Sequence, residues 1–129
     1  MSGRSEISLE SRPVLSHSAD AVVADELLFV AGILPVGAEG GLLGGDDVRE
    51  QARTVFSDLE RILAAGGCSG SDVARVSVYL TSIGDTEAVA GPLRQTCGVA
   101  AVAGSVVEVT GLAIPGAKIE IDAIAVRPS

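Results

Sequence analysis

Acidic side chains near the C-terminus are the residues best placed to do chemistry. In Lys118-Ile-Glu-Ile-Asp-Ala-Ile-Ala125, polar and apolar residues alternate, which is typical of a strand with one buried face. Glu120 and Asp122 therefore share a face, and we expect Glu108 in the preceding segment to lie on that face too. A partly buried carboxyl group can act as a general base or acid on a water or on a substrate proton.

A structural interpretation of Glu120 stands beside the catalytic one. Its carboxylate could pair with Lys118, with Arg75 or with a backbone amide at a subunit interface. Position alone does not indicate that Glu120 works with Asp122 or Glu108 as a paired acid and base.

Other reactive residue types are sparse. His17 is the single histidine and the one side chain that titrates near neutrality, so it is either a group at a binding site or a solvated residue of the N-terminal segment. Cys68 and Cys97 lie far apart without a C-x-x-C spacing, which favours two ordinary thiols over a zinc site or a disulfide. The glycines of residues 36–45 do not form a dinucleotide-binding motif. We therefore expect no metal and no cofactor.

Charge and length limit the classes of partner. The chain has 129 residues and a formal charge of −8, with 9 Lys and Arg against 17 Asp and Glu. This balance argues against nucleic acid, whose phosphates attract clustered cations. No apolar run is long enough to span a bilayer, and the N-terminus has no hydrophobic signal segment. We expect one cytoplasmic domain over residues 1–129, with residues 1–19 either flexible or an edge strand.

The pattern of the chain predicts more strands than helices. Alternation indicates strands at residues 6–10, 21–24, 27–31 and 73–81, and the polar pair Asp25-Glu26 suggests a hairpin. Residues 104–126 are expected to be two strands joined by a turn at Leu112 to Gly116. Ala74, Val76, Val78 and Leu80 are expected on one face of the strand over 73–81.

Two helices are expected between these strands. Asp46-Asp47 caps the first, whose apolar residues recur at helical spacing until Gly66-Gly67 ends it. Gln51 and Asp58 border its apolar arc and are expected to satisfy neighbouring polar groups. The second spans roughly 85–99, with Asp85 or Thr86 as its cap, and contains Pro92.

The order βββαβαββ predicts a two-layer α+β domain with a six-stranded mixed sheet. Two helices cover only one face of such a sheet. The other face would carry polar residues among exposed aliphatic ones in a chain that is 47 % hydrophobic. An oligomer that encloses this second face is the simplest resolution, and it would place a site between subunits.

Four blocks of this sequence resemble the RidA (YjgF/YER057c/UK114) family, in the correct order and over about residues 20 to 126. The segments are Phe29–Pro35, Gln51–Gly66, Asp72–Thr81 and Ala117–Ala125. The resemblance implies a chorismate-mutase-like fold and a homotrimer with three clefts between subunits. It also implies hydrolysis of 2-aminoacrylate-type enamines and imines to 2-keto acids and ammonia.

Carried over residue by residue, the resemblance keeps Glu120 as the acidic residue that orients the hydrolytic water. It places Gly104 where the family's deaminases have the arginine that binds the substrate carboxylate. The other positions that it assigns to substrate binding are Gly32, Ile33, Ser105, Val106, Ala90, His17 and Ser18. Without a guanidinium to pair with a carboxylate, a small pocket lined by Gly104, Val106, Ala90 and Ile33 would suit a neutral or apolar ligand.

Two functions remain open from the sequence. The first is an enzyme acting on an imine, an enamine or a related small metabolite, with Glu120 positioning water or a proton and with altered specificity. The second is a non-catalytic trimer that binds a small molecule or serves a structural role. Ribonuclease activity, which some relatives have, fits a charge of −8 poorly.

Overall fold

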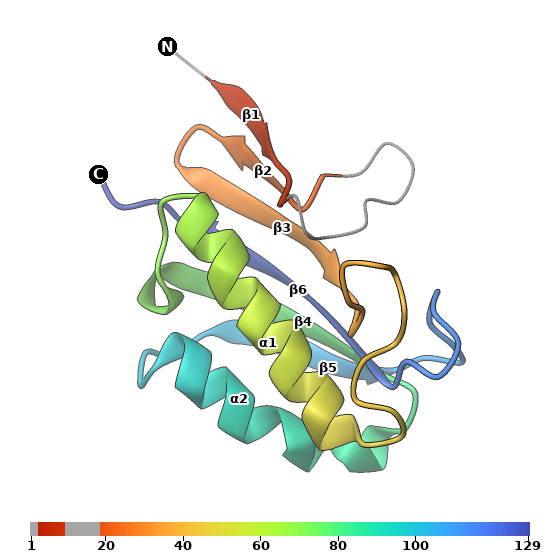
Figure 1. Ribbon diagram of the computed structural model, residues 1–129. Coiled ribbons are helices and arrows are strands. Elements are labelled where there is room, and N and C mark those ends of the chain that lie inside the picture. Colours follow the sequence, from red (N-terminus) through yellow and green to blue (C-terminus); the bar gives the residue numbers. More distant parts are fainter. Residues whose placement is uncertain (1–2, 10–18) are drawn as a thin grey trace.

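The computed structural model describes residues 3–9 and 19–129, which form one sheet with two helices packed on one of its faces (Figure 1). The elements are β1 (Arg4–Ile7), β2 (Ala21–Ala24), β3 (Leu27–Ile33), α1 (Val48–Ala65), β4 (Val73–Leu80), α2 (Glu87–Cys97), β5 (Ala103–Glu108) and β6 (Ile119–Val126). The predicted α+β architecture and the order βββαβαββ are confirmed.

The strands lie in the order β1-β2-β3-β6-β4-β5. Only β4 and β5 are parallel, and every other neighbouring pair is antiparallel. The predicted hairpin of β2 and β3 turns at Asp25, which has a φ of 53°. β1 pairs with β2 at one edge, as expected for an N-terminal edge strand, but it spans Arg4–Ile7 and not residues 6–10.

The two C-terminal strands are not neighbours, which corrects the prediction of a joined pair. A turn is present where it was expected, with the amide of Ala117 donating to the carbonyl of Ile114 at 3.0 Å. However, the connection crosses β4, so β5 pairs with one edge of β4 and β6 with the other. Periodicity specifies which residues share a face, but it does not specify which strand lies beside which.

Helix α1 follows the sequence closely. Asp47 caps it by accepting a hydrogen bond from the Arg49 amide, and the helix ends at Gly66. Helix α2 is shorter than expected, because Ile83–Thr86 forms a 3₁₀ turn before it. Neither Asp85 nor Thr86 caps α2 with its side chain. Thr86 Oγ1 instead donates to the carbonyl of Ile83 at 2.6 Å.

The core lies between the helices and the sheet and is built almost entirely of aliphatic side chains. Phe56 is the one aromatic residue in it. Ile119, Ile121, Ala123 and Ala125 of β6 are buried against α1, with at most 2 % of each exposed. No helix of the described residues is long and apolar enough to cross a membrane.

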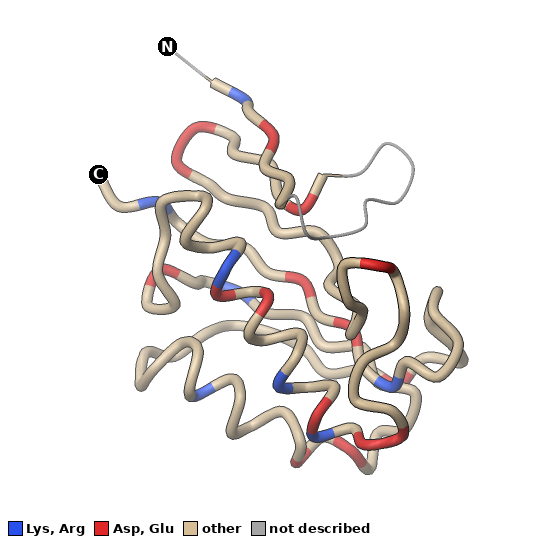
Figure 2. The backbone as a smooth tube through the Cα atoms, in the orientation of Figure 1, with Lys and Arg blue, Asp and Glu red and all other residues tan. Residues whose placement is uncertain are grey.

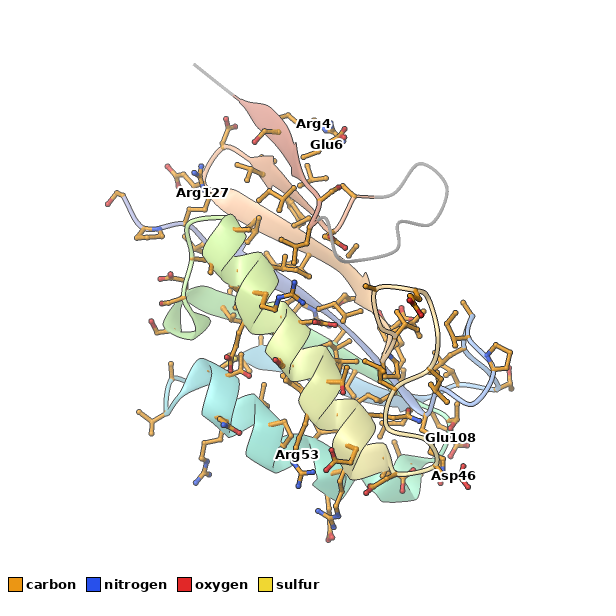
Figure 3. The ribbon with its side chains drawn as sticks, viewed as in Figure 1. Arg4, Glu6, Asp46, Arg53, Glu108 and Arg127 are labelled. Atoms are coloured by element: carbon orange, nitrogen blue, oxygen red, sulfur yellow. The ribbon has the colours of Figure 1, made fainter. Side chains whose placement is uncertain are left out.

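The Gln51 side chain links the first turn of α1 to the loop that leads into β6 by hydrogen bonds. Its Nε2 donates to the carbonyls of Gly45 (2.9 Å) and Gly116 (3.0 Å), and its Oε1 accepts from the Lys118 amide (2.7 Å). The side chain is fully buried, so these three bonds satisfy its amide. In the same loop, Lys118 Nζ lies 3.9 Å from Asp46 Oδ1. Figure 3 shows Asp46 at the end of the molecule opposite Arg127.

Removing the Gln51 amide is expected to destabilise the protein by about 2–4 kcal/mol, because Gln51→Ala leaves buried backbone groups without partners. The measurement is the free energy of unfolding in urea at fixed protein concentration. Ser57→Ala, on the exposed side of the same helix, serves as control and should change it by less than about 0.5 kcal/mol. A Gln51→Ala loss no larger than that of the control would contradict the role assigned to the amide.

Candidate functional site

The sheet face that the helices do not cover, called the open face below, carries polar side chains on its central strands. Register pairs place Tyr79 opposite Glu120 and Ser77 opposite Asp122 on β4 and β6. All four side chains are half-buried. Aliphatic and aromatic residues of the open face surround them: Val22, Leu27, Phe29, Val107 and Ile124.

Glu108 and Ala74 do not lie on the sheet faces that the sequence predicts for them. Glu108 pairs in register with Leu80 and therefore points to the helix side, where its Oε1 accepts a hydrogen bond from the Ile83 amide at 2.8 Å. Val107, not Glu108, reaches the open face. Ala74 was expected in the core, but a register shift between Val73 and Arg75 leaves it exposed.

Glu120 lies directly over Gly32 of β3. A register shift between Val30 and Ile33 makes Ala31 and Gly32 consecutive exposed residues, which is the arrangement of a β-bulge. A Cβ at Gly32 would lie 3.0 Å from Glu120 Cδ and would overlap Oε2. The absence of a side chain at Gly32 therefore makes room for the Glu120 carboxylate, which brings together two of the residues singled out in the sequence.

Burial raises the pKa of the Glu120 carboxyl above its ordinary value, and the charge of Asp122 raises it further. Among the described residues, no hydrogen-bond donor or cation contacts this carboxylate; Lys118 turns instead to Asp46. A half-buried carboxyl group with free oxygens can hold a water or exchange a proton with a bound molecule.

Asp122 has a partner that sequence analysis did not assign. The Tyr79 hydroxyl donates to Asp122 Oδ2 at 2.8 Å, and this hydrogen bond is the main reason why the pKa of Tyr79 is raised. The alternation of β4 and β6 places both residues on one face. Their contact also needs the antiparallel register of these strands, which no local pattern reveals.

The predicted residues of β5 lie at the sheet edge. A Cβ at Gly104 would lie 3.2 Å from the carbonyl carbon of Val76, and closer still to its oxygen. Ser105 is on the open face, where its Oγ accepts from Arg75 Nη2 at 3.4 Å. Val106 points to the other side and is 39 % exposed. Gly104 thus sits where the backbone leaves no room for a side chain.

The remaining predicted residues do not join Glu120 within one chain. Ile33 is 1 % exposed and belongs to the core, so Gly104, Val106, Ala90 and Ile33 do not line one pocket in this structure. Ala90 lies on α2, where it borders a groove between that helix and residues 98–102. His17 and Ser18 lie outside the described residues.

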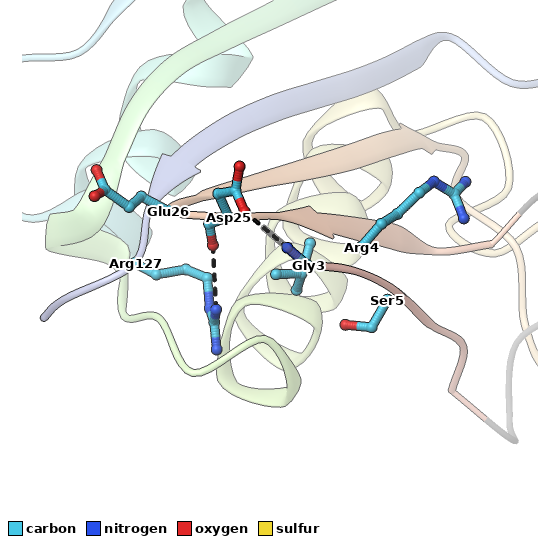
Figure 4. A pocket seen from close by; sticks show the side chains of 7 residues that line it. Gly3, Arg4, Ser5, Asp25, Glu26 and Arg127 are labelled. Atoms are coloured by element: carbon cyan, nitrogen blue, oxygen red, sulfur yellow. Dashed lines mark hydrogen bonds between the residues drawn. The ribbon is translucent and has the colours of Figure 1, made fainter. Parts of the chain in front are cut away.

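A second, shallow depression lies near the chain ends, far along the sheet from Glu120. It is lined by Gly3, Arg4, Ser5, Val23, Asp25, Glu26 and Arg127 (Figure 4). Its Arg127 guanidinium already donates to the backbone carbonyls of Gly66 (3.2 Å) and Asp25 (3.3 Å). These contacts give the arginine a structural role at the junction of β6, α1 and the β2–β3 hairpin.

The described residues contain no group of three or more side chains suited to hold a metal ion. Cys68 and Cys97 are free and buried, and burial raises the pKa of both thiols. Buried thiols with a raised pKa are poor nucleophiles. Among the described residues, Glu120 is the group singled out in the sequence that combines a raised pKa with oxygens available to a ligand.

Comparisons with known proteins agree with this fold along nearly the whole chain. The family described as Endoribonuclease L-PSP matches residues 9–127. RutC family protein PH0854 of Pyrococcus horikoshii is 33 % identical over 116 residues, 90 % of each chain. The 2-iminobutanoate/2-iminopropanoate deaminase of Capra hircus is 30 % identical over 109 residues, which are 84 % of this chain and 79 % of that protein.

A solved structure gives the same result. Rv2704 of Mycobacterium tuberculosis, a member of the YjgF/YER057c/UK114 family, matches with a TM-score of 0.77 and 30 % identity, covering 96 % of this chain and 99 % of that one. Sequence and fold thus agree over nearly the whole chain. This chain therefore belongs to the RidA (YjgF/YER057c/UK114) family, whose sequence pattern is described as Endoribonuclease L-PSP.

Proposed function

We propose that this protein hydrolyses a small imine, enamine or related metabolite in a cleft between subunits, with Glu120 positioning the water or the proton. The observation that carries the proposal is the Glu120 carboxylate itself. It is half-buried, it lies over Gly32, and it has no protein donor or cation among the described residues. Its oxygens are therefore available to a ligand.

The relatives support this class of reaction. The goat protein is named 2-iminobutanoate/2-iminopropanoate deaminase, and other relatives carry the same name. Hydrolysis of an imine needs a group that gives a proton to nitrogen and a group that takes one from water. A carboxyl group with a raised pKa serves both needs near neutral pH.

The substrate that we propose differs from a 2-imino acid. The family's deaminases bind the substrate carboxylate through an arginine at the position of Gly104. In this chain the Val76 carbonyl fills the space that a side chain at residue 104 would need. Without that guanidinium, an anionic ligand beside Glu120 would lose the bidentate charge-assisted contact that normally binds it. A neutral or less charged substrate fits better, in contact with Gly32 and Ser105 on the open face.

A homotrimer is part of the proposal, because the open face exposes large apolar side chains to solvent. Phe29 is 41 % exposed, Leu27 and Val126 are exposed close to it on β3 and β6, and Val107 is exposed on β5. Neighbouring subunits that cover these residues would remove apolar surface from water and enclose Glu120. His17, Ser18 and Ala90 would then be candidates to complete the cleft, from the same or from a neighbouring subunit.

The second candidate is a trimer that binds a small molecule without turning it over. Gly104 favours it, since the loss of a substrate anchor can accompany the loss of catalysis. RNA is a poor substrate for either candidate. The net charge is −8, and in the described part of the chain the lysines and arginines are scattered among acidic residues (Figure 2).

Replacing Glu120 is expected to abolish most of the hydrolysis. Imines generated in situ from a series of amino acids and from uncharged amines are incubated with the protein, and carbonyl product is followed over time. Loss of a general acid–base group reduces the rate by about 100-fold or more, so the hydrolysis rate of Glu120→Gln should be lower than that of wild type by at least this factor. Glu39→Gln, in an exposed loop, is the control. Equal rates for wild type and Glu120→Gln would contradict the proposal, and ligand-induced thermal stabilisation without turnover would favour the second candidate.

Glu120 is also expected to make the protein less stable as pH rises. Its folded-state pKa is raised, so between the ordinary glutamate pKa and the raised one the native state binds more protons than the unfolded state. The free energy of unfolding therefore falls as pH rises across this window. Above the window, the contribution of Glu120 no longer changes with pH. Glu120→Gln should abolish this pH-dependent loss of stability.

The measurement is urea unfolding of wild type, Glu120→Gln and Glu39→Gln between about pH 4 and pH 8. The difference between wild type and Glu120→Gln should grow from acid to neutral pH, whereas the difference for Glu39→Gln should stay nearly constant. Parallel curves for wild type and Glu120→Gln would show that the Glu120 pKa is not raised.

A charge on the open face is expected to dissociate the trimer. Phe29→Asp would bury an unpaired carboxylate in the interface, which is strongly unfavourable. Sedimentation equilibrium should give the trimer mass for wild type and a smaller mass for the variant. Val99→Asp is the matched control, because Val99 is 99 % exposed but lies after α2, away from the open face. A Phe29→Asp protein that remains trimeric at low concentration would contradict this interface.

A further inference from the structure

Tyr79, Ser77, Glu120 and Asp122 occupy the corners of one cross-strand square on the open face. Tyr79 is directly opposite Glu120, yet its hydroxyl reaches diagonally to Asp122 at 2.8 Å. Directly opposite residues have Cβ atoms about 5 Å apart, so the tyrosine ring passes close beside the Glu120 side chain. One side chain thus contacts Asp122 through its hydroxyl and flanks Glu120 with its ring.

The two carboxylates of this square have different partners. Asp122 accepts the Tyr79 hydroxyl, and a donated hydrogen bond stabilises the charged form of a carboxylate. Glu120 receives no such donor within the described chain, and it is flanked by an aromatic ring and by the bulge at Gly32. Burial and the charge of Asp122 both favour the protonated form of Glu120, and no donor in the described chain opposes them.

The charged groups around Glu120 do not alter this assignment. On β6, Asp122 faces it, and Lys118 is directed to Asp46. On β4, Tyr79 is its register partner, and Arg75 lies four residues away with its guanidinium at Ser105. On β3, the neighbouring residues are Ala31 and Gly32, which do not titrate.

We propose that Tyr79 and Asp122 form a positioning pair that keeps the exchangeable proton of the open face on Glu120. The hydroxyl of Tyr79 holds the Asp122 carboxylate in place, and the charge of Asp122 disfavours a second charge at Glu120. This inference rests on the proposed function, in which Glu120 handles that proton, and it assigns Glu120 the acid role at the start of the reaction.

In this reaction Glu120 first gives up its proton and then regains one. Protonated Glu120 gives its proton to the imine nitrogen while the oxygen of a water forms a bond to the imine carbon, and the C=N π pair moves to nitrogen. The resulting Glu120 carboxylate takes a proton from the added water. One water is consumed, a carbinolamine is formed, and Glu120 returns to its starting state. Tyr79 and Asp122 neither gain nor lose a proton.

The test measures the titration of Glu120 directly and needs no substrate. Protein labelled with ¹³C at the glutamate side-chain carboxyl is titrated by NMR, and the signal absent from Glu120→Gln identifies Glu120. Asp122→Asn removes the neighbouring charge, so the Glu120 midpoint should move to lower pH. Tyr79→Phe removes the hydroxyl that positions Asp122 beside Glu120, so the midpoint should also move to lower pH. In the Asp122→Asn background, Tyr79→Phe should move it no further, because Tyr79 acts through Asp122.

The double variant separates this role from a structural one. If the substitutions only loosened the sheet, Glu120 would gain water with each of them, and the double variant would move the midpoint further down than Asp122→Asn alone. That result, or no movement in Asp122→Asn, would overturn the proposal. Glu39→Gln removes the same charge far from the square and should leave the midpoint where it is.

Kinetics distinguish a failure here from a failure of the proposed function. If both midpoints move as expected but Glu120→Gln hydrolyses imines at the wild-type rate, the positioning pair stands and the proposed catalysis does not. If turnover depends on Glu120 but Asp122→Asn leaves the titration of Glu120 and the pH profile of turnover unchanged, the proposed catalysis stands and the positioning pair does not.

Discussion

The placement of β6 between β3 and β4 constrains everything else in this structure. On its helix side β6 buries Ile119 and Ile121 completely, and each such side chain contributes about 1.5–3 kcal/mol. On its other side the same strand carries Glu120 and Asp122. A slip of one residue would exchange the two sets, exposing the isoleucines and driving both carboxylates into the core. The packing of β6 into the hydrophobic core therefore keeps both acidic residues on the open face.

The same placement determines how polar the surroundings of Glu120 are. A strand at the sheet edge would have left the carboxylate in water, where its pKa would stay ordinary. In the sheet centre it has a neighbouring strand on each side, and burial by these strands is the main cause of its raised pKa. Gly32, in the bulge of β3, has no side chain that would displace the carboxylate. Strands β3 and β4 thus both bury Glu120, and β3 also leaves room for it.

Much of this fold could be predicted from the sequence, for identifiable reasons. The apolar spacing, the Asp47 cap and Gly66 define α1, because helical signals are local. Alternation in β4 and β6 placed Tyr79, Asp122 and Glu120 on one face. Strand neighbours are set by tertiary packing instead, which is why β5 and β6 were wrongly taken as a joined pair. The shifts at Ala74 and at Ala31-Gly32 also escaped prediction, since a bulge depends on the partner strand.

Glu120 was identified through its place in the family's final block, and the structure adds the reason why this carboxyl group differs from its neighbour. Asp122 has the same charge, lies on the same strand and is also half-buried, yet it accepts a hydrogen bond from Tyr79. Glu120 and Asp122 are two residues apart, so no sequence pattern separates their roles. The difference arises from a tyrosine some forty positions earlier in the chain, which the antiparallel register brings within 2.8 Å. In the mechanism that we propose, this hydroxyl positions Asp122, and the charge of Asp122 keeps the proton on Glu120.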